Sequence, residues 1–274
     1  MKIKFLLINL IILLSISVSL YPAAEQEFHY YLPLIIRDDS RVLIYLPDDY
    51  YSTDKRYPVL YFQDGELVYG KFSADFIVVC IKNTDRQIAR WNYLSPWIQY
   101  HMDNWWPGVP SVLGGDGEDY LNYILHTKSW IDQRYRTLSD REHTAIGGFS
   151  MGGLFSVYAG LERPEIFSKV IALSPAVWFG SRSPSAWLDQ NNLIDYINQT
   201  GNPDNVEFYF YVGGNEYHDN GYPLIGGDYP DIYKKGVYRL YNLLGGKLVF
   251  DPLGKHTQAV FINKLPAAFQ WLGW

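Results

Sequence analysis

Residues 148–152 read Gly-Phe-Ser-Met-Gly, a G-x-S-x-G pattern with Ser150 at its centre. A short apolar run leads into the pattern, and residues 154–162 leave it with the apolar spacing of a helix. Strand, tight turn and helix in this order form a nucleophile elbow, whose glycines leave room where a β-carbon would clash. The following helix directs its N-terminal amides at an oxyanion formed there. The alternative is a glycine-rich turn with an incidental serine; the flanking elements favour Ser150 as a nucleophile.

A serine nucleophile requires a general base, and in such elbows the histidine follows both the serine and the acid in the chain. Four histidines precede Ser150 and therefore have the wrong order: His29, His101, His126 and His143. Of the two that remain, His256 lies directly after a predicted strand at 247–250 and before the last predicted helix. We therefore predict His256 as the base, with His218 as the alternative, although a lone histidine is often only a solvated loop residue.

The acid that orients the base should follow the strand predicted at residues 206–212. Glu216 lies four residues beyond that strand, behind two glycines, and 40 residues before His256. Asp219 and Asp228 are alternatives, and each of the three carboxylates would otherwise be an ordinary surface loop residue. We predict Glu216 as the acid.

An oxyanion formed at Ser150 requires two hydrogen-bond donors. The first should be the backbone N–H of Met151, the residue after the nucleophile. The second should come from the loop after the strand predicted at 57–62, where we favour the N–H of Glu66. Because both donors belong to the backbone, this prediction depends on topology and not on side-chain type.

The elements that must position these residues alternate between strand and helix. Strands are predicted at 41–47, 57–62, 76–81, 169–175, 206–212 and 247–250, and helices at 119–135, 232–244 and after Thr257, where Pro266 must kink or restart the helix. The long segment 97–117, rich in tryptophan, proline and glycine, is predicted as loop. Continuous apolar strands indicate a mostly parallel sheet buried on both faces. The sequence therefore predicts a single α/β domain over residues 25–274.

The first 24 residues have the pattern of a secretory signal peptide. Lys2 and Lys4 precede an apolar run over residues 5–20, and small residues follow, with cleavage predicted near 19–24. The apolar run is short for spanning a bilayer, which disfavours an uncleaved anchor. A secreted or periplasmic protein without stable membrane insertion is expected. The sole cysteine, Cys80, lies in an apolar strand and is expected to be an inert core residue.

Charge and motif content exclude several other classes of function. The formal net charge is −6, without a basic stripe, which argues against nucleic acid as a partner. No H-E-x-x-H or C-x-x-C spacing offers a metal site, and no G-x-G-x-x-G opens a helix, so no cofactor is expected. The oligomeric state cannot be read from the sequence.

Residues 35–272 resemble the esterase D-like branch of the α/β-hydrolases. The resemblance is carried by the strand and loop at 57–65, the segment 90–96, the block 131–178 around the elbow, Gly214-Asn215-Glu216, and Gly254-Lys255-His256. The branch includes feruloyl and acetylxylan esterases, enterochelin-type siderophore esterases, S-formylglutathione hydrolases and mycolyltransferases. The chain departs from the branch at Tyr93, where relatives often carry an acid, and in its tryptophan-rich loop.

The resemblance implies an α/β-hydrolase fold, with a mostly parallel central sheet and helices on both faces. It also implies a serine esterase that forms an acyl-enzyme on Ser150 and takes a small-molecule or polysaccharide-linked ester. The alternatives are an acyltransferase with the same acyl-enzyme, and a non-catalytic carbohydrate- or partner-binding protein on a hydrolase scaffold. We expect Trp97, Trp105 and Trp106 either to form an acyl or sugar pocket or to pack their loop onto the body.

Overall fold

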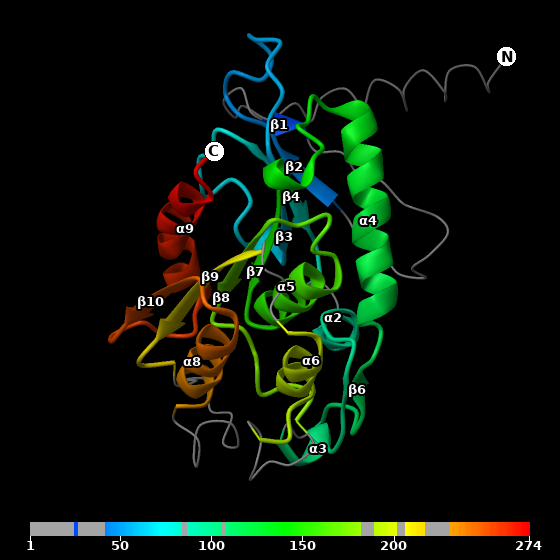
Figure 1. The fold of residues 1–274 in the computed structure, drawn as a ribbon, viewed down its shortest axis with the longest axis vertical. Helices are drawn as coiled ribbons and strands as arrows, with labels where there is room; N and C mark the ends of the chain where they lie inside the picture. The colour runs from blue at the N-terminus through cyan, green and yellow to red at the C-terminus, as the bar shows by residue number, and fades with distance from the viewer. Residues whose placement is uncertain are drawn as a thin grey trace, which may run out of the picture.

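The computed structural model describes residues 25–26, 42–83, 87–105, 108–181, 189–201, 206–216 and 231–274. The predicted signal peptide, at 1–24, lies outside these ranges, as do five further residues named above: His29, Trp106, His218, Asp219 and Asp228. The described part contains one large sheet with helices on both sides of it (Figure 1).

The sheet has the strand order β1-β2-β4-β3-β7-β8-β9-β10. Its strands are β1 (Glu25–Gln26), β2 (Val42–Tyr45), β3 (Val59–Gln63), β4 (Ile77–Ile81), β7 (Thr144–Phe149), β8 (Lys169–Leu173), β9 (Glu207–Gly213) and β10 (Lys247–Asp251). The pairings of β2 with β1 and β4 are antiparallel, and all pairings from β4 to β10 are parallel. The carboxyl ends of β3, β7, β8, β9 and β10 therefore meet at one edge, as the mostly parallel prediction requires.

Helices cover the two faces of the sheet unequally. The described helices are α2 (Gln87–Tyr93), α3 (Met102–Trp105), α4 (Gly117–Arg134), α5 (Met151–Glu162), α6 (Asn192–Thr200), α8 (Ile232–Leu244) and α9 (Gln258–Leu272), with 3-10 turns η1 (Gly65–Leu67) and η2 (Arg141–His143). Side chains of α4, α5, α6 and α8 share one buried apolar cluster with the sheet, whereas α9 shares the other. Figure 1 shows α9 and α4 on opposite sides of the strands.

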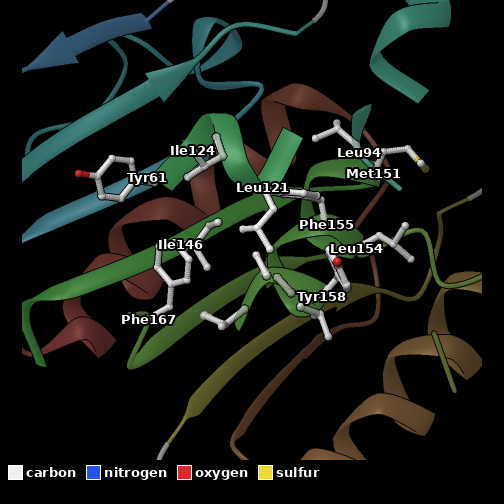
Figure 2. Packing of buried hydrophobic residues seen from close by; sticks show 14 of the residues in the cluster. Tyr61, Leu94, Leu121, Ile124, Ile146, Met151, Leu154, Phe155, Tyr158 and Phe167 are labelled. Carbon is white, nitrogen blue, oxygen red and sulfur yellow. The ribbon is translucent and has the colours of Figure 1, made fainter. Parts of the chain in front are cut away.

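The continuous apolar strands are explained by burial on both faces. In β3, Val59 and Tyr61 point into the cluster under α4 and α5, whereas Leu60 and Phe62 point into the cluster under α9, and all four are buried. Figure 2 shows the first cluster, in which strand residues such as Tyr61 lie near side chains of α4 and α5. A strand with no solvated face has no position for a polar side chain, so its sequence does not alternate.

The closing helix and the tryptophan-rich segment differ from the sequence prediction. Helix α9 begins after Thr257, whose hydroxyl accepts from the Val260 N–H at 3.4 Å, and it continues through Pro266, so of the predicted kink or restart the restart is wrong. Packing of its apolar face, including Leu265, against the sheet outweighs the hydrogen bond that proline removes. The segment predicted as loop contains α3 and two short paired strands, β5 (Ile98–Gln99) and β6 (Leu113–Gly114).

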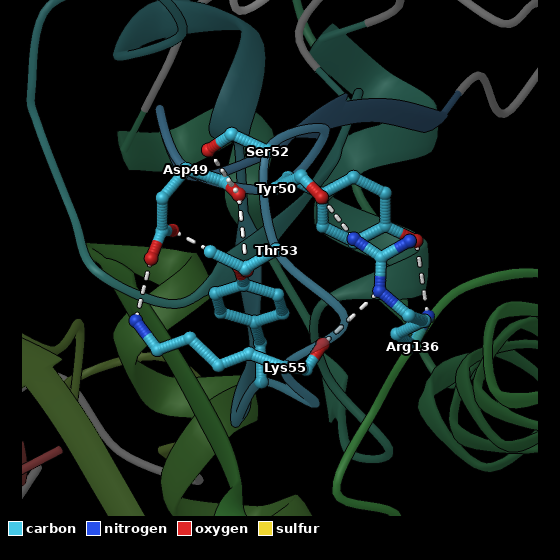
Figure 3. Close-up of polar contacts among 7 residues, drawn as sticks. Asp49, Tyr50, Ser52, Thr53, Lys55 and Arg136 are labelled. Carbon is cyan, nitrogen blue, oxygen red and sulfur yellow. Dashed lines mark hydrogen bonds and ion pairs between the residues drawn. The ribbon is translucent and has the colours of Figure 1, made fainter.

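The amino edge of the sheet is closed by a polar cluster between the β2–β3 connection and the chain after α4 (Figure 3). The Arg136 side chain donates from Nε to the Lys55 carbonyl at 3.1 Å, and its guanidinium lies 4.0 Å from the Tyr50 ring centroid. Tyr50 in turn accepts from the Arg136 backbone N–H at 3.0 Å. This cluster joins the chain before β3 to the chain after α4, at the edge of the sheet opposite the elbow.

Candidate active site

Ser150 lies in the turn between β7 and α5, with φ 57° and ψ −121°, a strained conformation for a residue with a side chain. The two glycines of the motif make this turn sterically accessible. A β-carbon on Gly148 would lie 2.7 Å from the carbonyl carbon of Gly152, and one on Gly152 would lie 2.9 Å from Cβ of Gln63. The strand, turn and helix therefore have the geometry of a nucleophile elbow.

Glu216 and His256 form a buried contact at the same edge of the sheet. The Glu216 Oε2 and His256 Nδ1 atoms are 3.0 Å apart, and the two side chains are 3% and 7% exposed. The other carboxylate oxygen, Oε1, accepts from the Gly213 N–H at 2.6 Å and from the Ser174 hydroxyl. With Nδ1–H donating to Glu216, the second ring nitrogen of His256 is an acceptor.

The loops that carry the acid and the histidine are joined by backbone hydrogen bonds. Gly214 donates to the Asp251 carbonyl at 2.7 Å, and Asn215 donates to the Gly254 carbonyl at 2.9 Å. A β-carbon on Gly213 would lie 2.2 Å from the Gly254 carbonyl oxygen, so this approach requires glycine. The parallel pairing of β9 and β10 therefore brings together two residues that lie far apart in sequence.

Tyr233 of α8 connects this pair with Ser150. Its ring centroid lies 4.1 Å from that of His256, at an interplanar angle of 30°. Burial raises the pKa of Tyr233 well above its usual range, and the nearby Ser150 hydroxyl opposes that rise. Ser150 and His256 are thus both neighbours of one buried tyrosine.

The predicted oxyanion donors lie on the two elements beside Ser150. Met151 is the first residue of α5, and the N–H groups of a first helical turn have no partner within the helix. Glu66 lies in η1 directly after β3, and its Oε1 accepts from the Asn83 N–H at 2.9 Å, which anchors the loop. A β-carbon on Gly152 would lie 3.2 Å from Oδ2 of Asp64, so this loop lies against the elbow.

A buried ion pair between Arg90 and Asp64 holds the loop that precedes Glu66. Arg90 of α2 donates from Nε and Nη2 to the two carboxylate oxygens of Asp64, at 2.8 and 2.6 Å. Burial acts to lower the pKa of Arg90, but Asp64, with Glu66, more than offsets this and raises it. Asp64 itself has φ 55°, so the bidentate contact holds a backbone conformation that few residues adopt.

Four residues of this region were not predicted as site residues: Asp64, Arg90, Ser174 and Tyr233. In the structure Asp64 and Ser174 each follow directly after a strand, β3 and β8, whereas the sequence prediction extended the second strand over Ser174. Ser174 is fully buried and has φ 45°. For Tyr233 the sequence has no comparable signal, because it lies inside a helix among other apolar residues.

The three tryptophans named for a substrate pocket, Trp97, Trp105 and Trp106, do not lie in one element of the structure. Trp97 is half-buried and packs against Tyr158 and Tyr196, with ring centroids 5.6 and 6.0 Å away. These contacts join Trp97 to α5 and α6. Trp105 ends α3, and Trp106 lies outside the described residues.

Two further features bear on chemistry. Within the described ranges, no three histidine, cysteine, aspartate or glutamate side chains gather as metal ligands would. No helix there is long and apolar enough to cross a membrane.

Cys80 is buried in β4 beneath residues 64–67, the loop predicted to carry the second oxyanion donor (the predicted oxyanion loop), and burial raises the pKa of its thiol, so it has little thiolate character.

An elbow serine near a carboxylate–histidine pair, at the carboxyl edge of a mostly parallel sheet, defines the α/β-hydrolase class. The model of the family described as Putative esterase matches residues 35–272, and the chain belongs to this family. The resemblance noted from the sequence, and the fold expected from it, are thereby confirmed.

Individual relatives are distant. The uncharacterised protein YbbA of Bacillus subtilis is 24% identical over 150 residues, which cover 52% of this chain and 58% of YbbA. The structure is similar to an IroE-like serine hydrolase from Shewanella oneidensis, with a TM-score of 0.64 and 19% identity over 85% of this chain and 76% of that one. It is also similar to the enterobactin esterase FES from Shigella flexneri, with a TM-score of 0.61, 15% identity and coverage of 85% and 55%. The chain therefore spans only a little over half the length of YbbA and of FES.

Proposed function

We propose that the protein is a secreted serine esterase with Ser150 as nucleophile, His256 as general base and Glu216 as the orienting acid. The observation that carries the proposal is the buried 3.0 Å contact between Glu216 and His256, at the edge of the sheet where the elbow presents Ser150. Membership of the esterase family supports the same reaction class.

In the first half of the reaction, His256 accepts the hydroxyl proton of Ser150 while Oγ forms a bond to the ester carbonyl carbon. The resulting imidazolium is stabilised by Glu216, and its proton passes to the leaving alcohol as the ester C–O bond breaks. Water, deprotonated by His256, then attacks the acyl-enzyme and releases the acid. The Gly213 N–H and the Ser174 hydroxyl donate to Oε1 of Glu216, which holds the carboxylate in place for this role.

The backbone N–H groups of Met151 and Glu66 are proposed to stabilise the tetrahedral oxyanion. Loss of one such donor typically costs about 3–4 kcal/mol of transition-state stabilisation. The Asp64–Arg90 pair and the Glu66–Asn83 hydrogen bond fix the loop that carries the second donor, so it requires little reorganisation during the reaction.

The proposed substrate is a carboxylic ester on a small molecule or on a polysaccharide. The enterobactin esterase to which the fold is similar supports a small-molecule ester, and feruloyl esterases of the resembling branch support a polysaccharide-linked one. Residues 1–24 are proposed as a cleaved secretory leader, and residues 25–274 as a single esterase domain.

Hydrolysis of p-nitrophenyl acetate and butyrate by the mature chain tests the reaction class. Ser150→Ala should lower kcat by about 10⁶-fold. Ser129→Ala, on the exposed side of α4, is the matched control and should retain full activity. If neither ester is hydrolysed, labelling by a fluorophosphonate that requires Ser150 still supports a serine hydrolase. Activity that persists in Ser150→Ala, or labelling elsewhere, would overturn the proposal.

A further inference from the structure

Strand β10 ends the central sheet, and its outer edge has no partner strand among the described residues (Figure 1). The Gly214 N–H donates to the Asp251 carbonyl, and Asp251 is paired with Gly213, so the backbone groups of Asp251 face β9. Successive residues of a strand direct their N–H and C=O groups to opposite edges. Leu248 and Phe250 therefore present theirs at the outer edge, which is a template for another strand.

The side chains of β10 differ between the two faces of the sheet. On the face covered by α9, Lys247, Val249 and Asp251 follow one another, and Val249 packs against the apolar cluster there. On the other face, Leu248 and Phe250 lie on the side of α8, and Phe250 is 39% exposed. The strand thus has one apolar face, and one face with a cation at its start and an anion at its end.

Antiparallel pairing of β10 with its own copy about Val249 matches these side chains. Lys247 then lies opposite Asp251 of the second copy, and Leu248 lies opposite Phe250. Because Leu248 and Phe250 present the outer backbone groups, each pair of these residues can exchange two hydrogen bonds. A shift of two residues in either direction breaks the match of Lys247 with Asp251. One of these shifts also places Pro252, which has no N–H, opposite Leu248.

We propose that β10 is a dimerisation edge, at which two copies of this chain join their sheets by antiparallel pairing centred on Val249. The interface is isologous, as the two-fold symmetry of a homodimer requires. The carboxyl edges of the two sheets then point in opposite directions, so the pairing does not bring one copy over the elbow of the other. The proposal does not depend on the proposed esterase activity.

The charges on the strand favour a second copy over an unrelated strand. A lysine on an edge strand can protect that edge, because pairing would bury its charge. In the self-pairing each Lys247 meets an acid, whereas a neutral strand would leave it unmatched. Asp251 can accept from this second lysine, since Lys264 and the Leu253 N–H occupy only part of its carboxylate.

A disulfide tests the register directly. Val249 would form a pair without hydrogen bonds, with Cα atoms about 4.5 Å apart, which a disulfide can bridge. Because the native Cys80 is 0% exposed, the cysteine of Val249→Cys is the reactive one. With oxidised glutathione, Val249→Cys should form a covalent dimer on a non-reducing gel, and reductant should separate it.

Lys247→Cys is the matched control for this cross-link. Residue 247 is more exposed than Val249 and lies on the same face, so random collision would favour it. In the proposed register its own copy lies about 13 Å further along the strand, beyond the reach of a disulfide. Equal or faster cross-linking of Lys247→Cys would overturn the proposal.

Sedimentation over a concentration series tests the dimer without new cysteines. The mature chain should be dimeric, and Lys247→Glu, which places acids opposite each other, should weaken dimerisation about 10- to 100-fold. About 1 M salt should restore the dimer of this variant, which a misfolded chain would not show. Arg134→Glu, at the exposed end of α4, has the same change of charge and should remain dimeric.

A wild-type monomer at every concentration, or a dimer that Lys247→Glu leaves unchanged, would overturn the proposal. Esterase activity per chain should be the same in Lys247→Glu and in the wild type. The dimer can therefore be refuted while hydrolysis still depends on Ser150, and Ser150 can be refuted as nucleophile while the dimer remains.

Discussion

The nucleophile elbow and the acid–histidine pair are built in opposite ways. The elbow is contained in residues 148–152, where Ser150 has a strained backbone and the two glycines leave room for each other and for Gln63 of the neighbouring strand β3. The Glu216–His256 pair joins residues 40 positions apart through backbone hydrogen bonds between the loops that follow β9 and β10. One half of the candidate site is determined by steric room around a tight turn, and the other by hydrogen bonds between two loops.

The difference predicts how each half fails. Substitutions that add side-chain volume should disrupt the elbow, because its turn forms only where there is no room for a β-carbon. The Glu216–His256 pair should be disrupted by loss of its charge, of a hydrogen bond or of the contact between the two loops, because a network of polar contacts holds it in place. Substitutions in the two halves can therefore test whether they are independent.

Neutralising the acid should have the largest effect on the pair. In Glu216→Gln the shape is retained, but the amide cannot stabilise an imidazolium, and the histidine tautomer becomes wrong. We expect kcat to fall about 10⁴-fold with little change in Tm. The measurement is steady-state hydrolysis of p-nitrophenyl acetate. Asp219→Asn tests the alternative acid. A larger loss of kcat in this variant than in Glu216→Gln would identify Asp219 as the orienting acid.

Adding one carbon at the loop contact should have the next largest effect. In Gly213→Ala the new carbon would lie 2.2 Å from a backbone oxygen, so the two loops must separate. We expect unfolding free energy to fall by about 1–3 kcal/mol, as in overpacked cores, and kcat to fall with it. Denaturant unfolding measures the first quantity. In Gly153→Ala the nearest atom would be 3.2 Å away, and an equal loss there would contradict the proposed steric cause.

Much of this architecture could be predicted from sequence because its causes are local. Apolar runs marked the strands, and five residues marked the elbow. Glu216 and His256 could be proposed from chain order because the residues after parallel strands meet at one edge. The position of Tyr233 could not be predicted, since it depends on the contact of Gly236 with Val177, two residues from different elements. Helix α9 continuing through Pro266 depends likewise on tertiary packing.

Removing the hydroxyl of Ser174 should weaken the pair without breaking it. Ser174→Ala deletes one of the two donors to Oε1 of Glu216, and the Gly213 N–H remains. A loss of about tenfold in kcat is expected, the value of one hydrogen bond to a charged group. Ser168→Ala is the control, because its buried hydroxyl has no hydrogen-bond partner among the described residues. Equal kinetics in the two variants would show that Ser174 does not orient Glu216.

The smallest effect is expected at the base of the histidine loop. Asp251 lies 2.7 Å from Lys264, and that contact holds the pKa of Asp251 below its ordinary 3.8. Since the folded state favours the ionised form, the stabilisation is present at neutral pH and disappears as pH falls below about 4. Asp251→Asn should lose about 0.2–1 kcal/mol of stability at neutral pH and nothing at pH 3. Thermal unfolding at both pH values checks this; a gap that persists in acid would contradict it.

The buried position of Cys80 has a consequence under the proposed export of the chain to an oxidising environment. A single accessible thiol there would exchange with other disulfides and couple two chains. Cys80 is 0% exposed, and a β-carbon on Gly65 of the oxyanion loop would lie only 2.3 Å from its own β-carbon. Any reagent must therefore wait for this part of the molecule to open before it can react. The rate at which a thiol-specific dye labels the folded protein would then measure how often the oxyanion loop separates from the sheet.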